Sequence, residues 1–406
     1  MNRRGFLASS SALALAPGAA AAQSRAAVML GDDVLLTDVW REIGNRCVGI
    51  VTNQTGVTSQ HGSIVDALRR KSQVCVKALF APEHGLRGDR PAGAYVPSYT
   101  DPVSGLPVYS LYGATRHPSA AMLSGIDLLL FDIQDVGARA YTFISTMAYV
   151  MQAAAEHGKE IWILDRPNPI GGTVVEGPVL EPEYKSFIGL YPIAMRHGMT
   201  VGELAQMYNE AFGIHAKLRV IPMRGWQRSM LWDATRLPWI QSSPNIPSWQ
   251  TTLLYPCTGL VASAGLNNAT GSPRPFQYAG AYGLDAQRFA DAMNALHLPG
   301  VSFQGVVWVP ASGFWAGKQL TGAALGVNNP PAFLAVRTAV ELLVTARQIA
   351  PHVISIESRT SIDRDWGTDT LREGLLAGKS ADAIIAEWQP RLAEFNTLRA
   401  KYLLYQ

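Results

Sequence analysis

Short apolar runs alternate with amphipathic segments along the first half of the chain. The apolar runs have the length of buried strands, and they cover residues 47–52, 74–80, 106–110, 126–133, 161–164 and 218–221. Apolar residues at helical spacing mark 34–43, 64–70, 141–156 and 201–212. Continuous apolar strands separated by amphipathic helices predict a parallel sheet with helices on both faces. We therefore expect an α/β fold with a Rossmann-like, doubly wound and mostly parallel sheet.

The pattern changes between residues 222 and 275, where Pro, Trp, Ser and Asn are frequent. This segment is predicted to be a long irregular connection, whose tryptophans would either stack on carbohydrate or pack a domain interface. Beyond it, helices are expected at 284–296, 331–347 and 381–403, and strands at 301–309 and 353–356. We expect a Rossmann-like domain over 23–225, and a smaller α+β domain over 226–406 that includes the connection.

The start of the chain has the pattern of a twin-arginine signal peptide, over residues 1–22. Arg3 and Arg4 precede a short apolar stretch and a run of small residues. That stretch is too short to span a bilayer, so we expect no stable membrane insertion. We expect a periplasmic protein. The formal net charge of +3, without a Lys/Arg-rich run, gives no reason to expect a nucleic-acid partner.

Composition and cysteine usage fit a globular, metal-free protein. Apolar residues make up 48% of the chain and charged residues 16%, which indicates a large core. Because the twin-arginine route exports folded chains from a reducing compartment, we expect Cys47, Cys75 and Cys257 to be small buried hydrophobes without a disulfide framework. No Cys/His spacing resembles a zinc site, and no glycine-rich cofactor loop or serine-nucleophile elbow occurs. No metal or cofactor is therefore predicted.

Polar residues follow four of the predicted strands. Because the carboxyl ends of parallel strands share one edge of a sheet, these residues are expected to form a site there. They are Asn53 after the first strand, Glu83 and His84 after the second, Asp132 and Asp135 after the fourth, and Asp165, Arg166 and Asn168 after the fifth.

Glu83 is the best candidate for a general acid. Such a role needs a carboxyl group in a partly apolar setting, and Glu83 follows an apolar strand, with glycines nearby that leave room for a ligand. Alternatively, it caps a turn and pairs with Arg87 or Arg90. Asp132 could face Glu83 across one gap, as paired carboxylates do in glycoside hydrolysis. Asp135 is instead expected to cap the following helix.

The Asp165–Arg166 pair either fixes its loop or offers Arg166 to an anionic group of a substrate. His197 and Arg274 are looser candidates for the same edge of the sheet.

Long motifs in a fixed order resemble the NamZ-like exo-β-N-acetylmuramidases, glycoside hydrolase family 171. The most characteristic is Pro82-Glu83-His84-Gly85, and the resemblance covers nearly the whole chain after the signal segment. The other matching segments are 51–56, 105–113, 132–139, 165–172, 176–178, 196–200, 243–247 and 401–405.

The resemblance implies a Rossmann-like domain, a smaller C-terminal domain and a cleft between them. It also implies release of N-acetylmuramic acid from the non-reducing end of peptidoglycan fragments, with Glu83 as the catalytic residue. The substrate would be a small carbohydrate, a muropeptide or peptidoglycan fragment, used in cell-wall recycling. On this basis Asn53 and His84 are expected to bind sugar hydroxyls, Arg166 or Arg274 the lactyl carboxylate, and Arg139, Asp165, Asn168 and His197 to complete the substrate site.

One segment departs from the family pattern. Ala262 and Asn268 stand where the family has glutamates, and Thr270 stands where it has an arginine. A second carboxylate would then come from Asp132 or Glu176, or the substrate's own acetamido group would act as nucleophile. A changed amino-sugar specificity and a non-catalytic muropeptide-binding protein are the alternatives that this departure leaves open.

Overall fold

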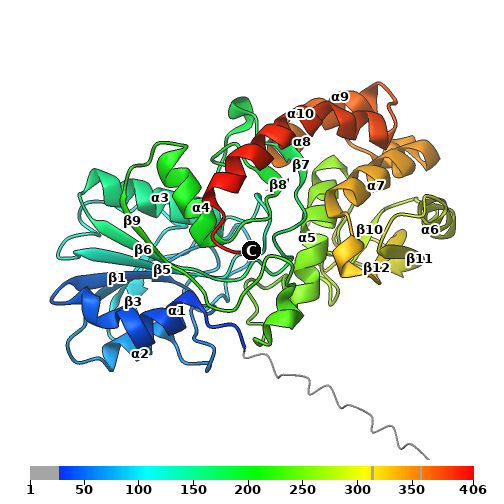
Figure 1. Cartoon of the computed structure of the whole chain (residues 1–406). Coiled ribbons are helices and arrows are strands. Elements are labelled where there is room, and N and C mark those ends of the chain that lie inside the picture. Colours follow the sequence, from blue (N-terminus) through cyan, green and yellow to red (C-terminus); the bar gives the residue numbers. More distant parts are fainter. Residues whose placement is uncertain (1–26, 312–314, 357–358) are drawn as a thin grey trace, which may run out of the picture.

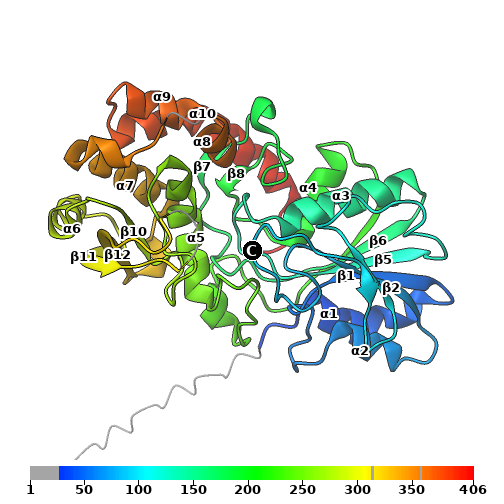
Figure 2. The same ribbon diagram turned by 180° about the vertical axis from the view of Figure 1, so that it is seen from behind.

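The computed structural model describes residues 27–311, 315–356 and 359–406. The expected signal segment, 1–22, lies outside the described residues. Two domains lie side by side, and helix α10 (Ala381–Arg399) runs from the second domain towards the first (Figures 1 and 2).

The first domain is built on a seven-stranded sheet with the order β3-β4-β2-β1-β5-β6-β9. All neighbouring strands are parallel except β3, which is antiparallel to β4 at one edge. Without β3, this is the strand order of the doubly wound Rossmann fold. The six predicted strands are confirmed, as β1 (Cys47–Thr52), β2 (Cys75–Ala81), β4 (Pro107–Ser110), β5 (Leu128–Asp132), β6 (Glu160–Leu164) and β9 (Lys217–Ile221), and β3 is Tyr99–Thr100.

Helices cover both faces of this sheet, because apolar side chains alternate between them along each strand. Leu128 and Leu130 pack in the cluster that includes α2 (Ile64–Arg69), whereas Leu129 and Phe131 pack in the cluster that includes α3 (Phe143–Glu156). The predicted helix at 34–43 is α1 (Gly31–Val34) followed by a π turn (Leu35–Val39) and a 3₁₀ turn (Trp40–Ile43), and 201–212 is α4 (Val201–Glu210).

The second domain contains a three-stranded antiparallel sheet with the order β10-β12-β11. Its strands are β10 (Tyr278–Ala281), β11 (Val301–Trp308) and β12 (Leu320–Val327). Its helices are α5 (Trp249–Val261), α6 (Ala286–Ala295), α7 (Ala335–Ile349), α8 (Arg359–Trp366), α9 (Thr370–Leu376) and α10. Between the domains, β7 (Glu176–Val179) and β8 (Ala194–Arg196) form a two-stranded antiparallel ribbon. Short 3₁₀ turns cover Pro182–Tyr184, Trp232–Thr235, Ala262–Ala264, Pro330–Ala332, Pro351–Val353 and Ala400–Tyr402.

Two expectations for secondary structure are wrong. Helix α5 lies inside the segment that was expected to be irregular, although it carries Pro256 and two threonines in its first turn. Its apolar residues pack in the main core beside α7, and such tertiary packing outweighs weak helix propensity. The strand expected at 353–356 is absent, because Pro351 starts a 3₁₀ turn there.

The expectation for the cysteines is wrong for two of the three. Cys47 and Cys75 form a disulfide, because the β1–β2 register places them side by side with their Cα atoms 4.5 Å apart. Cys75 is exposed and Cys47 is half-buried. Cys257 is free and buried, as expected.

The end of the chain returns to the first domain (Figure 1). The Tyr405 hydroxyl donates to Asp165 Oδ2 at 2.5 Å, and the Leu404 amide donates to Glu203 Oε1 at 2.8 Å. The segment after β9 also packs on the first domain, since Trp226 and Trp232 share an apolar cluster with Val28. The C-terminal residues are therefore part of the support of the Rossmann-like sheet.

Candidate active site

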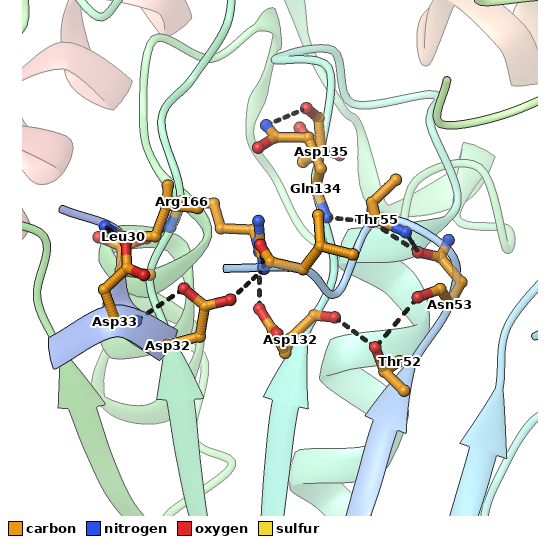
Figure 3. Close-up of polar contacts among 12 residues, drawn as sticks. Leu30, Asp32, Asp33, Thr52, Asn53, Thr55, Asp132, Gln134, Asp135 and Arg166 are labelled. Atoms are coloured by element: carbon orange, nitrogen blue, oxygen red, sulfur yellow. Dashed lines mark hydrogen bonds and ion pairs between the residues drawn. The ribbon is translucent and has the colours of Figure 1, made fainter. Parts of the chain in front are cut away.

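A buried ion-pair network lies at the carboxyl ends of β1, β5 and β6, where the strand order reverses (Figure 3). Arg166 Nε lies 2.6 Å from Asp132 Oδ1, and Arg166 Nη2 lies 2.9 Å from Asp32 Oδ2. Burial raises the pKa of both carboxyl groups, and the adjacent guanidinium opposes that rise. Because both carboxylates are inaccessible, Arg166 mainly neutralises buried charge and joins α1 to β5 and β6.

This arrangement bears on two of the predicted roles. The Arg166 guanidinium is almost fully buried and bound to protein carboxylates, so it is not presented to a substrate. Asp132 Oδ2 has no hydrogen-bond partner, but no hydrogen bond or ion pair joins Asp132 to Glu83 among the described residues. The role of Asp132 as second carboxylate remains a prediction.

Glu83 lies two residues after the end of β2, in a turn in which the Gly85 amide donates to the Pro82 carbonyl. Its side chain is held at both oxygens. The Gly93 amide donates to Oε1 at 2.8 Å, and the Thr142 hydroxyl donates to Oε2 at 2.6 Å. Only 8% of Glu83 is exposed, so the carboxyl group is largely shielded from water while it keeps a fixed orientation.

The two partners of Glu83 have different chemistry. An amide N–H can only donate, so Oε1 stays an acceptor towards Gly93. A hydroxyl can donate or accept a hydrogen bond, so the Thr142 oxygen can also accept a hydrogen bond from Oε2 when that oxygen carries a proton. The same two contacts therefore fit both the charged and the neutral carboxyl group. A general acid passes through both forms, so its surroundings must fit both.

A chain of aromatic rings leads from Glu83 into the second domain. Tyr141, next to Thr142, donates its hydroxyl to Ser242 Oγ at 2.8 Å. Its ring centroid lies 5.5 Å from that of Tyr255 on α5, which in turn lies 5.1 Å from that of Phe276. Glu83 therefore lies at the junction of the two domains.

The segment that departs from the family pattern joins this chain of rings. The Phe276 amide donates to the Asn268 carbonyl at 2.8 Å, and Asn268 is buried. Its side-chain oxygen accepts from the Thr270 amide at 3.2 Å. Ala262 is exposed, in the 3₁₀ turn after α5. Asn268 thus has a structural use within its own loop, on the second-domain side of the junction.

Two further predicted residues lie around the loop that follows Glu83. His84 has a positive φ of 70°, and its Nδ1 lies 2.7 Å from the Arg90 carbonyl. Asn53 accepts from the Thr55 amide at 2.9 Å, and its Nδ2 has no hydrogen-bond partner. Asn53 lines a cavity of about 220 Å³, and Arg90 lines a neighbouring one of about 360 Å³. Asn53 Nδ2 is buried, so the role of Asn53 in binding a sugar hydroxyl stays a prediction that rests on its place at the cavity.

Arg139 and Asn168 have structural partners instead. Arg139 donates to the carbonyls of Pro178 at 2.9 Å and of Trp366 at 2.7 Å. Burial lowers the pKa of Arg139 to about 9. Asn168 donates to the Met199 carbonyl at 3.0 Å and accepts from the Ile170 amide. These contacts fix the β7–β8 ribbon and the loop after β6, and they leave neither side chain exposed to a ligand.

Asp165 fixes the start of α4. Its carboxylate accepts from the Thr200 hydroxyl and the Gly202 amide, both at 2.8 Å, in addition to Tyr405. Burial raises the pKa of Asp165 to about 7. The loop interpretation of the Asp165–Arg166 pair therefore agrees with the geometry.

The three remaining predicted residues, His197, Asp135 and Arg274, make contacts with protein groups other than Glu83. His197 is buried, with Nε2 at 3.7 Å from Asp135 Oδ2. Asp135 accepts from the Gly137 amide at 2.6 Å, so the expectation that it caps the next helix is wrong, because α3 begins only at Phe143. Arg274 is exposed beside the small sheet, 3.4 Å from Gln277 Oε1.

The Glu176 carboxylate is also bound by other groups of the protein. It pairs with Arg196 at 3.1 Å and accepts from the Ala335 amide at the start of α7. Burial raises its pKa, and Arg196 opposes that rise. Glu176 thus joins the ribbon to the second domain.

Sequence reasoning missed Asp32, Thr142 and Tyr112. Asp32 and Tyr112 carried a usable signal. Asp32 follows the short apolar run 28–30 after one glycine, and Tyr112 lies two residues after the predicted strand 106–110. Thr142 carried none, because it contacts Glu83 across 59 positions of sequence.

No group of three or more His, Cys, Asp or Glu within residues 27–311, 315–356 and 359–406 could hold a metal ion. Within the same ranges, no helix has both the length and the apolar character that crossing a membrane requires.

Comparison with known proteins places these features in a family. Residues 48–250 match the model of the N-terminal domain of the exo-β-N-acetylmuramidase NamZ, and residues 253–405 match that of its C-terminal domain. The chain is 43% identical over 378 residues to the peptidoglycan β-N-acetylmuramidase NamZ of Bacillus subtilis, covering 93% of this chain and 91% of that protein.

Two solved structures from Bacteroides fragilis have the same fold. Both are crystal structures of DUF1343 family proteins. One is 35% identical with a TM-score of 0.87, covering 93% of this chain and 99% of the other. The second is 29% identical with a TM-score of 0.73, covering 94% and 99%. Together with the matched domain models, these likenesses show that the chain belongs to the NamZ exo-β-N-acetylmuramidase family.

Proposed function

We propose that this protein is a glycoside hydrolase that releases N-acetylmuramic acid from the non-reducing end of peptidoglycan fragments, with Glu83 as its general acid. The observation that carries the proposal is the Glu83 carboxyl group, which is largely buried and held by Gly93 and Thr142 at the domain junction. A carboxyl group so placed can protonate the oxygen of a leaving sugar without competition from bulk water.

The fixed orientation of Glu83 is the physical reason for expecting catalysis. Cleavage of a glycosidic bond requires a proton at the bridging oxygen as the bond to the anomeric carbon breaks. Asn53 lines a cavity near the same strand ends and is the residue expected to orient a sugar hydroxyl, although its Nδ2 is buried in the protein alone. His84 faces its own loop through Nδ1, which leaves Nε2 as the ring nitrogen available to a substrate.

A chromogenic β-N-acetylmuramic acid glycoside tests the proposal directly. Wild-type protein should release the chromophore, and Glu83→Gln should lower kcat by about 100-fold or more, because general acid catalysis is worth about 10²- to 10⁴-fold. Glu181→Gln is a matched control that makes the same chemical change away from Glu83. Full activity in Glu83→Gln would refute the assignment of Glu83 as the acid. Absence of turnover by wild type would refute the proposed muramidase activity.

A second candidate is a glycosidase with a different amino-sugar specificity. It is favoured by Ala262 and Asn268, which stand where the family pattern has glutamates, on the second-domain side of the junction. A panel of β-linked amino-sugar glycosides decides between the two, since this candidate requires a higher kcat/KM on a sugar without the lactyl group. Binding of muropeptide without product release would instead indicate a non-catalytic binding protein.

We also propose that the protein works in the periplasm, exported by the twin-arginine route, in cell-wall recycling. Arg3 and Arg4 in the start of the chain support the route. The Cys47–Cys75 disulfide supports an oxidising compartment for the folded protein. Fractionation of cells with an intact and an Arg3→Lys/Arg4→Lys leader tests this, because retention of the variant in the cytoplasm is expected.

A further inference from the structure

Arg116, in the loop after β4, lies on a small group of aromatic rings. Its guanidinium carbon is 4.2 Å from the ring centroid of Phe187 and 5.0 Å from that of Tyr112. The Phe187 ring is itself stacked on Tyr149 of α3, with centroids 5.9 Å apart and planes within 15°. Arg116 is exposed, whereas the three rings are half-buried. The rings therefore restrict the orientation of the guanidinium while its edges remain open to solvent.

Tyr112 connects this group to Glu83. The preceding Leu111 amide donates to the Ala81 carbonyl at 2.8 Å, which places the loop beside the end of β2, two residues before Glu83. The Tyr112 carbonyl accepts from the Val96 amide at 3.0 Å, in the segment that follows Gly93. Burial raises the pKa of Tyr112, the Glu83 carboxylate raises it further, and the Arg116 guanidinium opposes both. The Tyr112 side chain thus lies between the candidate acid and the arginine.

Arg116 differs from the arginines that were expected to bind an anion. Arg166 is bound to two buried carboxylates, and Arg274 lies beside the small sheet of the second domain. Arg116 makes no ion pair with a carboxylate among the described residues, although it is close to the Glu83 site. A stacked guanidinium without a carboxylate partner is suited to bind a planar anion through two parallel hydrogen bonds.

We propose that Arg116 binds the carboxylate of the substrate's lactyl group and so selects N-acetylmuramic acid over N-acetylglucosamine. The two sugars differ by this anionic substituent, and the site offers one oriented cation for it beside Glu83. Phe187 and Tyr112 are positioning residues, because they act on the substrate through Arg116. The assignment of the substrate group rests on the proposed function.

The test is a comparison of two substrates with Arg116→Met, which keeps an unbranched side chain and removes the charge. On a chromogenic β-N-acetylmuramide, kcat/KM should fall by about 10- to 150-fold, the value of a hydrogen-bonded charged contact. On the matching β-N-acetylglucosaminide it should change by no more than about threefold. Arg116→Lys should recover part of the loss on the muramide, because it restores the charge without the planar fork.

Arg288→Met is the matched control, since it removes the same charge from an exposed position on α6. It should leave both substrates unchanged. Equal losses on both substrates in Arg116→Met, or no loss on the muramide, would overturn the assignment while leaving the muramidase activity intact.

If wild type turns over neither substrate, the proposed function fails, and calorimetry with free N-acetylmuramic acid then tests Arg116 alone. Tighter binding of N-acetylmuramic acid than of N-acetylglucosamine, lost in Arg116→Met, would support the carboxylate site. Equal affinity of wild type and Arg116→Met for N-acetylmuramic acid, or no binding by wild type, would refute it.

Discussion

Thr142→Val should impair the chemical step while leaving the fold in place. Valine has the shape of threonine without the hydroxyl, so the variant removes one of the two hydrogen bonds that hold the Glu83 carboxyl group. Thr142 and Glu83 are 9% and 8% exposed, so water cannot freely replace the lost partner. A buried acceptor without its donor costs about 2–3 kcal/mol when it carries charge. If that cost appears in the transition state, kcat falls by about 30- to 150-fold.

The assay separates a catalytic effect from a loss of structure or binding. Steady-state kinetics on the chromogenic muramide should show a lower kcat with KM changed by no more than about threefold, because Thr142 is not assigned to the substrate. Thr142→Ser keeps the hydroxyl and should recover most of the activity. The melting temperature of Thr142→Val should stay within a few degrees of wild type, since one neutral hydroxyl is lost.

The reasoning fails if Thr142→Val keeps kcat within about threefold of wild type and is correctly folded. The Thr142 contact would then be structural, and the orientation of Glu83 would depend on Gly93 alone. An equal loss in Thr142→Ser and Thr142→Val would also contradict it, because the hydroxyl would then be irrelevant to the effect.

Three further predictions concern stability. Arg166→Met leaves two buried carboxylates unpaired and should cost about 3–5 kcal/mol, which lowers the melting temperature by roughly 10 °C; Arg288→Met should leave it unchanged. Because the folded pKa of Asp165 is about 7 against an ordinary 3.8, its protonated form favours folding below about pH 4, and this contribution is lost as pH rises through 7. Between about pH 4 and 7, the unfolding free energy of wild type should therefore fall relative to that of Asp165→Asn. If the two unfolding free energies change with pH in parallel, the contribution of Asp165 is refuted. Cys47→Ala/Cys75→Ala opens a loop of 28 positions and should cost about 3–4 kcal/mol by chain entropy, with a melting temperature that no longer responds to reductant.

The sequence was sufficient to predict the sheet and the location of Glu83. Apolar runs such as Leu128–Phe131 are continuous, and the residues after parallel strands meet at one edge whatever the loops do. The same rule identified Arg166 and its partner Asp132 but not Asp32, because Asp32 comes from α1 and its contact depends on how that helix enters the sheet. Side-chain partners between distant segments are set by packing, which periodicity does not encode.

The second domain was harder to predict for a related reason. Its core depends on contacts between segments far apart in sequence, such as α5 and α7, and α5 has a weak helical pattern with an internal proline. The Cys47–Cys75 disulfide was not predicted, because export of a folded chain from a reducing compartment argues against one. The register that places Cys47 beside Cys75 depends on how β1 pairs with β2, which the apolar pattern of the two runs does not set.

The distribution of carboxylates explains why so much depends on Glu83. Asp132 and Glu176, the two candidates for a second carboxylate, are each paired with a buried arginine, which lowers their availability to a substrate. Asp135 differs from them, because it pairs with no arginine among the described residues. Its charge, like that of Glu83, raises the pKa of Tyr141 beyond the larger effect of burial. Glu83 and Asp135 therefore lie around the same tyrosine. A mechanism with two carboxylates would most economically use that pair, and a mechanism that relies on the substrate's acetamido group would need Glu83 alone.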